Sequence, residues 1–309
     1  MRSKAFTATA AVVIGLTTFL AVALASAGST SASPALKSFY NGFETNTDGW
    51  CDLASNPNYG PCDGKANGTI DRVMSGFSNY ALYAPFVGSS EGKWHARVSG
   101  VTNTPGGPCV GSGSGASSPS APCAGPYTDW EARAKASSFP SKGFTTSLDI
   151  YLDTTWASSH PDIRFDWDTA LNDNKGNFLQ DYVFNAGTSP TAWPGGSGFV
   201  VNASTNADRS GAFPENPCPS PSSAPNTCRV PVTITTSGWY SFVHHFYVTG
   251  GNLAVQMTIV KVSTGKTVPG ANWTIYPGQA ISGVGGPYAG YFPNEEILGL
   301  PIDRSMLKT

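Results

Sequence analysis

The sequence has few charged residues of either sign. Of its 309 residues, 18 are Lys or Arg and 20 are Asp or Glu, which leaves a formal net charge of −2. A protein that binds nucleic acid needs a basic stripe to meet the phosphates, and electrostatic attachment to a membrane needs a cluster of Lys and Arg. The chain has neither pattern. We therefore expect no nucleic-acid partner.

Several catalytic signatures are also absent. The chain has no G-x-S-x-G, no H-E-x-x-H, no phosphate-binding loop and no dinucleotide-binding fingerprint. Their absence disfavours esterases of the usual fold, zinc proteases and nucleotide-dependent enzymes. Apolar residues at helical spacing are almost missing as well, which argues against a helical fold.

One long apolar run is present, and it lies at the N-terminus. Two basic residues precede residues 5–25, and Ala25-Ser26-Ala27 forms an A-x-A cleavage site. This order predicts a secretory signal peptide over residues 1–27 and a flexible segment over 28–37. A membrane anchor is the alternative, but small residues follow the run instead of a basic cluster. We expect a secreted, extracellular protein of bacterial type with no membrane insertion.

The six cysteines fall into three neighbouring couples within stretches rich in Pro, Gly, Ser and Asn. An even count in an exported chain indicates disulfides, and proximity in sequence favours pairing within each couple. A zinc site is the alternative, but no C-x-x-C spacing occurs and histidine is rare. The expected disulfides therefore join Cys51 to Cys62, Cys109 to Cys123 and Cys218 to Cys228.

Short runs with period-two alternation recur along the chain, separated by turn residues, and this pattern is typical of an all-β protein. We expect one large antiparallel β-sandwich over residues 38–309, with two disulfide-stapled rim loops at 101–126 and 213–228. Interdomain linkers are the alternative for these two loops. The Thr249-Gly250-Gly251-Asn252 sequence predicts a hairpin turn. Strands are predicted at 38–44, 81–86, 94–98, 129–136, 144–152, 162–168, 181–185, 198–202, 230–235, 238–248, 253–262 and 290–293.

A family resemblance supports this fold. Residues 41–50 (NGFETNTDGW), 92–96 (GKWHA) and 238–255, together with the ending Ile302-Asp303, resemble the concanavalin A-like and laminin-G-like jelly-roll superfamily of secreted bacterial proteins that bind or cleave carbohydrate. The resemblance covers most of the chain after residue 27. It implies a jelly roll whose last strand pairs beside the first, and a polysaccharide or glycan as partner.

The most distinctive local pattern is residues 162–168, Asp-Ile-Arg-Phe-Asp-Trp-Asp. On a strand, Asp162, Arg164, Asp166 and Asp168 share one face, while the apolar residues between them face the core. Three interpretations stay open for this row. The first is a salt-bridged strand face or a cation site, and the second is a saccharide-binding groove with Arg164 among its contacts. The third is a catalytic pair of carboxylates.

A second strand is expected to extend the same face, because Asp149 and Tyr151 alternate with apolar residues in 144–152. If the two strands adjoin, their polar sides form one acidic, aromatic-rimmed surface. Gln180 and Tyr182 are candidates for further polar contacts. Tryptophans beside loop-like residues are candidates for platforms on which sugar rings stack, with core packing as the alternative for each; they are Trp130, Trp156 and Trp193.

His244 and His245 lie in the middle of a predicted strand, so one should be buried and the other exposed. His245 shares its face with Tyr247, and a His–Tyr pair serves as base and acid in polysaccharide lyases. A structural histidine is the plainer alternative. The jelly-roll resemblance also implies a structural Ca²⁺ between the first and last strands, with Glu44, Asp303 and Asn41 as ligands.

Three functional hypotheses follow from these patterns. The first is a secreted carbohydrate-binding protein that uses an acidic, aromatic-rimmed face. The second is a polysaccharide-cleaving enzyme, either a glycosidase with paired Asp or a lyase with His245 and a tyrosine. The third is a structural surface protein without a small ligand.

Overall fold

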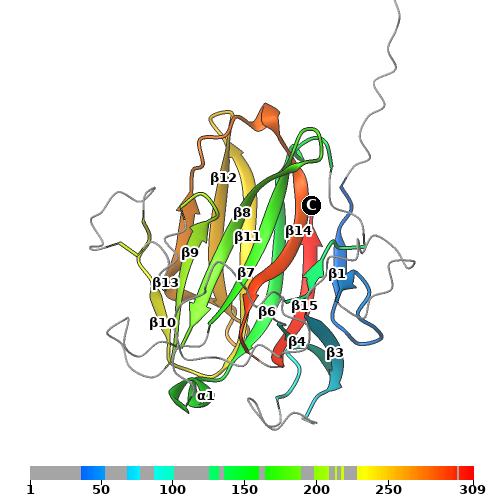
Figure 1. Cartoon of the computed structure of the whole chain (residues 1–309), viewed down its shortest axis with the longest axis vertical. Coiled ribbons are helices and arrows are strands. Elements are labelled where there is room, and N and C mark those ends of the chain that lie inside the picture. Colours follow the sequence, from blue (N-terminus) through cyan, green and yellow to red (C-terminus); the bar gives the residue numbers. More distant parts are fainter. Residues whose placement is uncertain are drawn as a thin grey trace, which may run out of the picture. The chain divides into compact units, whose positions relative to one another are not determined.

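The computed structural model describes residues 36–52, 68–76, 87–100, 125–131, 136–159, 164–188, 198–208, 213, 217–218, 228–297 and 299–309, apart from the side chains of 156, 158 and 159. These residues form two antiparallel sheets (Figure 1). They also form one short helix, α1 (Thr154–Ser159), and a 3-10 turn, η1 (Ile281–Gly283).

The first sheet has eight strands within the described residues. Seven follow the order β13-β12-β11-β6-β15-β4-β3, and β1 pairs with β15. Their bounds are β1 (Phe39–Asn41), β3 (Thr69–Met74), β4 (Trp94–Ser99), β6 (Phe144–Leu152), β11 (Gly238–Thr249), β12 (Asn252–Lys261), β13 (Lys266–Ile275) and β15 (Leu300–Lys308).

The second sheet has seven strands in the same part of the chain, in the order β10-β9-β8-β7-β14-β5-β2. Their bounds are β2 (Trp50–Cys51), β5 (Tyr127–Thr128), β7 (Arg164–Asp173), β8 (Phe178–Gly187), β9 (Phe199–Thr205), β10 (Val232–Ile234) and β14 (Val284–Glu295).

The two sheets pack face to face over an aromatic core. Phe242 of β11 contacts Phe165 of β7 and Phe184 of β8, with ring centroids 6.1 and 5.2 Å apart. Tyr182 of β8 meets Phe246 of β11 edge-on at 5.5 Å. Such pairs stabilise a core beyond the area that they bury. The predicted all-β sandwich is confirmed.

Three local predictions are also confirmed. The strand expected over 144–152 is β6 to the residue. The predicted hairpin joins β11 to β12, with Thr249 paired to Asn252. Gly250 and Gly251 have φ angles of 55° and 78°, as a type I′ turn requires, and glycine adopts these angles without steric cost. The last strand pairs beside the first, because β15 is bonded to β1.

Other expectations were wrong. β6 and β7 do not adjoin, because β6 lies in the eight-stranded sheet and β7 in the seven-stranded sheet. The strand expected over 129–136 is not formed over its described part: Trp130 and Glu131 occupy a turn with φ near 52° and 57°. The strand expected over 81–86 lies outside the described residues. Strands β2, β3, β5 and β13 were not predicted.

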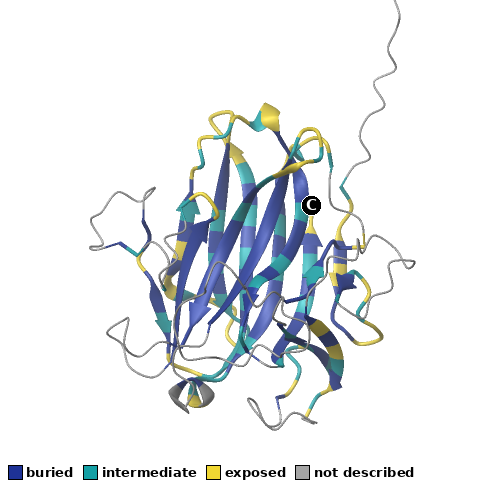
Figure 2. Ribbon diagram, viewed as in Figure 1, coloured by how far each residue is buried: buried dark blue, intermediate teal, exposed yellow. Residues whose placement is uncertain are grey.

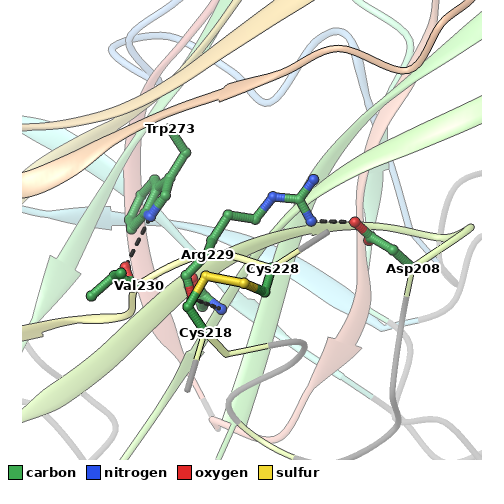
Figure 3. Close-up of a disulfide and its surroundings, with 7 residues drawn as sticks. Asp208, Cys218, Cys228, Arg229, Val230 and Trp273 are labelled. Atoms are coloured by element: carbon green, nitrogen blue, oxygen red, sulfur yellow. Dashed lines mark hydrogen bonds and ion pairs between the residues drawn. A yellow bond between two sulfur atoms is a disulfide. The ribbon is translucent and has the colours of Figure 1, made fainter. Parts of the chain in front are cut away.

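One disulfide fastens a rim loop of the seven-stranded sheet. Cys218 is bonded to Cys228, as predicted, and the main-chain N–H of Cys218 donates to the carbonyl of Arg229 at 2.8 Å (Figure 3). Cys51 is also disulfide-bonded, while Cys62, Cys109 and Cys123 lie outside the described residues. None of the helices in the part of the chain that the structure describes has the length and apolar character needed to cross a bilayer.

Candidate functional site

The polar row predicted on residues 162–168 is covered in the structure. Every residue of β7 except the last is buried, on both faces of the strand (Figure 2). Phe165 and Trp167 face the core as predicted. Arg164, Asp166 and Asp168 point to the other side but have almost no exposed surface. Asp162 lies outside the described residues.

The carboxylate of Asp166 is buried, and both of its oxygens accept hydrogen bonds. Arg164 donates to both of its carboxylate oxygens, from Nε at 2.9 Å and from Nη2 at 2.7 Å. The amide of Asn185 donates to the same carboxylate at 3.0 Å, and Ser204 donates to Asn185 in turn. Phe213 lies over the Arg164 guanidinium. A buried ion pair of this kind lowers the cost of burying its two charges, and it leaves no carboxylate open to a ligand.

The remaining residues expected around that row are also inaccessible where they are described. Trp130 is buried against Gly290, where an added Cβ would come within 3.1 Å of the Trp130 ring. Tyr182 lies in the core, and Gln180 is buried and accepts a hydrogen bond from Gln279. None of these three side chains can stack on a sugar. The side chain of Trp156 and the whole of Trp193 lie outside the described residues.

The outer face of the eight-stranded sheet, turned away from the core, is instead partly exposed along β11. Along β11 the burial alternates: Tyr240, Phe242, His244 and Phe246 are buried, and the residues between them are partly exposed. This alternation follows from the two-residue period of a strand. We call the outward-facing side chains the β11 strip; they are Trp239, Ser241, Val243, His245 and Tyr247.

Aromatic rings gather at the Tyr247 end of the β11 strip. The rings of His245 and Tyr247 stack with centroids 5.1 Å apart and an interplanar angle of 22°. Tyr276, which directly follows β13, forms a side-chain hydrogen bond with Tyr247 and is 51% exposed. Burial, together with this neighbour, raises the pKa of Tyr247. The buried Ala254, opposite Tyr247 on β12, leaves room for the rings above it.

The Trp239 end of the β11 strip is a second aromatic group. Trp239 meets the Tyr151 ring edge-on at 5.5 Å and the His95 ring at 5.8 Å. Its indole N–H donates to the carbonyl of Gly88 at 2.7 Å. Burial, and then the charge of Arg97, lowers the pKa of His95 to about 4, so this imidazole is neutral at pH 7. These contacts hold the Trp239 ring in one orientation.

Two carboxylates lie on directly opposite positions of β6 and β15, and one of them, Asp149, is opposite Ser241 of the β11 strip. Asp149 accepts hydrogen bonds from Ser241, from Ser90 Oγ at 2.9 Å and from Arg304 Nε at 2.5 Å. Asp303 accepts from the N–H groups of Ser90 and Glu91 at 2.9 and 3.2 Å. We call Asp149, Asp303, Arg304 and Ser90 the carboxylate cluster.

Burial has a clear effect on the carboxylate cluster. Desolvation is the largest cause that raises the pKa of Asp303, to about 6, although N–H donors from Arg304, Glu91 and Ser90 oppose it. Arg304 reaches Asp149 because a bulge interrupts β15 after Asp303, where Arg304 has a φ of 44°. In a regular strand its side chain would point to the opposite face from Asp303. The bulge therefore places a cation beside two buried acids.

Two of the residues expected to bind calcium are hydrogen-bonded to backbone groups. Glu44 accepts the N–H groups of Lys93 and Trp94 at 2.9 and 3.0 Å. Asn41 accepts the N–H of Phe43 and donates to the carbonyl of Asp48. Among the residues that the structure describes, no group of three or more His, Cys, Asp or Glu side chains is arranged to hold a metal ion. A structural calcium ion stays a prediction.

Of the predicted site residues, Asp149, Tyr151, His245, Tyr247 and Asp303 lie on the outer face of the eight-stranded sheet. Arg164, Asp166 and Asp168 lie on the opposite side of the sandwich. Sequence reasoning did not select Trp239, although it shares the face of His245 in the two-residue period. Tyr276 was missed because Pro269 and Gly270 interrupt the alternation of β13. No family model matches the sequence, and no curated protein matches it significantly.

Proposed function

We propose that this is a secreted carbohydrate-binding protein whose binding surface is the β11 strip with Tyr151 and Tyr276. The observation that carries the proposal is the pair of partly exposed aromatic groups at the two ends of one strand, with hydroxyl and amide side chains on the strands beside it. Aromatic rings offer an apolar surface that complements the C–H faces of a sugar, and their edges and hydroxyls can hydrogen-bond.

The disulfide and the N-terminal signal-like sequence support the secreted location. Disulfides form and persist in oxidising compartments, and Cys218 is disulfide-bonded to Cys228. An extracellular protein meets polysaccharides directly, which fits a glycan ligand.

The test is retention on a panel of insoluble polysaccharides, comparing the wild type with Trp239→Ala and Tyr247→Ala. Each variant removes one aromatic group, and we expect its dissociation constant to rise by about tenfold, the order of one lost stacking contact. Phe178→Ala is the matched control, because Phe178 is 44% exposed but belongs to the seven-stranded sheet. Failure of the wild type to bind any polysaccharide, or equal losses in the control, would sink the proposal.

Cleavage of the glycan is a second candidate function, and the carboxylate cluster favours it. Asp149 and Asp303 both accept a hydrogen bond from Ser90 Oγ, so their carboxyl groups lie close together, next to Ser241 of the β11 strip. Paired carboxylates are the catalytic groups of glycosidases. The same panel tests this alternative: release of reducing ends that disappears in Asp149→Asn would establish hydrolysis, whereas binding without release leaves the protein a lectin.

A further inference from the structure

We infer that the β11 strip selects electrically neutral, extended polysaccharides and rejects acidic ones. This inference rests on the proposed carbohydrate binding and names the class of glycan that the same surface would take. It depends on the charges that border the strip, on the hydrogen-bonding groups within it and on its length.

The side chains that flank the β11 strip are uncharged over most of its length. Ser147 and Thr145 of β6 pair with Val243 and His245 on one side, and Thr258 and Gln256 of β12 pair with the same two residues on the other. On β13, Asn272 and Thr274 extend the surface by one more strand. Hydroxyl and amide groups both donate and accept hydrogen bonds, as the hydroxyls of a neutral sugar require.

The few charged groups at the margin do not favour an anion. Asp149 and Asp303 are carboxylates, and the nearby Arg304 already donates to Asp149. Lys308 is exposed at the end of β15, opposite Thr145. Within the described residues, none of the side chains paired with the strip on β6 or β12 is cationic, so a uronate or sulfate lying along it would lose water without gaining an ion pair from these two strands. Burying an unpaired charge is costly, whereas a neutral sugar pays no such penalty.

The geometry favours an extended chain over a single sugar. Trp239 and Tyr247 are eight residues apart on one strand, which corresponds to about 27 Å at ~3.4 Å per residue. The two aromatic groups face the same side of the sheet. One polysaccharide chain that runs along β11 can therefore contact both, and each contact makes the other more probable because the second becomes intramolecular.

The experiment uses the polysaccharide that retains the protein in the panel, together with its hydroxyethyl and carboxymethyl derivatives. The two derivatives carry substituents of similar size on the same backbone and differ in charge. In affinity electrophoresis we expect the hydroxyethyl polymer to bind and the carboxymethyl polymer to bind at least about tenfold more weakly, as an unpaired buried charge implies. Oligosaccharides of the retained backbone should bind more tightly as they lengthen, until both aromatic groups are reached.

A charge variant sharpens the test. Gln256→Lys adds a cation beside His245 and should strengthen binding to the carboxymethyl polymer, while Ala207→Lys adds the same charge in the exposed turn after β9 of the seven-stranded sheet and should not. Equal or tighter binding of the carboxymethyl polymer by the wild type would overturn the selectivity while leaving carbohydrate binding intact. A panel without any retained polysaccharide would overturn both proposals, and retention of acidic glycans alone would overturn only this one.

Discussion

At the scale of single residues, His244 and His245 show how one strand gives adjacent residues of the same type different environments. His245 stacks on Tyr247 at the surface. His244 is fully buried between the sheets, with its Nδ1 3.2 Å from Thr169 Oγ1 and its ring 4.7 Å from Phe184. Burial lowers the pKa of His244 from 6.5 to about 3, although a hydrogen bond to the Tyr182 backbone opposes the shift. The folded protein therefore holds this imidazole neutral.

A buried neutral histidine predicts a specific loss of stability in acid. Between pH 6.5 and about 3 the unfolded chain binds a proton at His244 that the folded protein does not, so stability falls as the pH falls. In His244→Phe this contribution disappears, and we expect the drop in unfolding free energy between pH 7 and 4 to shrink by about 3 kcal/mol. Denaturant unfolding over this pH range measures it. Phe184→Leu, which alters the packing but keeps the imidazole, should retain the wild-type pH dependence.

At the scale of strands, the two-residue period predicted which residues share a face but not what covers that face. The pattern correctly placed Phe165 and Trp167 in the core. The same pattern predicted that Asp166 is exposed, but Asp166 is buried. Phe213 and Asn185, which come from distant parts of the chain, surround its ion pair with Arg164. The sequence pattern also did not predict that β6 pairs with β11 and β15, because the order of strands in a sheet depends on long-range contacts.

Irregular strands were the hardest part of the fold to predict. The bulge of β15 has no marker in sequence, since its positive φ falls on Arg304 and not on glycine. β13 was missed because it is largely exposed and contains Pro269 and Gly270, which weaken a strand pattern. Both errors affect the candidate site. Without the bulge, Arg304 was not recognised as the partner of Asp149, and without β13, Tyr276 was not recognised as a neighbour of Tyr247. Regular strands such as β6 were predicted in full.

The bulge in β15 leads to a testable prediction at this scale. Arg304→Met removes the guanidinium from Asp149, whose side chain is 2% exposed, while that of Arg304 is 31% exposed. We expect a loss of about 2 kcal/mol in unfolding free energy, less than for a fully buried pair because solvent reaches the arginine. Adding Asp149→Asn to Arg304→Met should recover part of the loss, since the unpaired charge is then gone. A double-mutant cycle by denaturant unfolding with additive effects would contradict this coupling.

At the scale of the whole sandwich, the disulfide and the proposed binding surface belong to different sheets. The disulfide-bonded Cys218 and Cys228 and the adjacent Arg229 lie with the seven-stranded sheet, where Arg229 forms an ion pair with Asp208 (Figure 3). The indole N–H of Trp273 in β13 donates to the carbonyl of Val230 at 3.0 Å. This rim segment therefore links the two sheets at one edge.

Removing the disulfide tests that separation. The pair of substitutions Cys218→Ser and Cys228→Ser opens a loop with a sequence separation of 10 residues. We expect about 2–3 kcal/mol less unfolding free energy, from the greater chain entropy of the unfolded state. Retention on the polysaccharide that binds the wild type should stay unchanged below the melting transition, because the β11 strip is on the other outer face. Loss of binding without loss of stability would place the ligand near the rim loop instead.

The alternation along β11 has a consequence for how this protein can change over evolutionary time. Even-numbered positions from Tyr240 to Phe246 are packed in the core, and substitutions there disturb the whole molecule. Odd-numbered positions from Trp239 to Tyr247 are partly exposed on the outer face and do not reach the core. A lineage can therefore exchange one outward side chain at a time and acquire a new ligand preference, while the packing that holds the two sheets together is inherited intact.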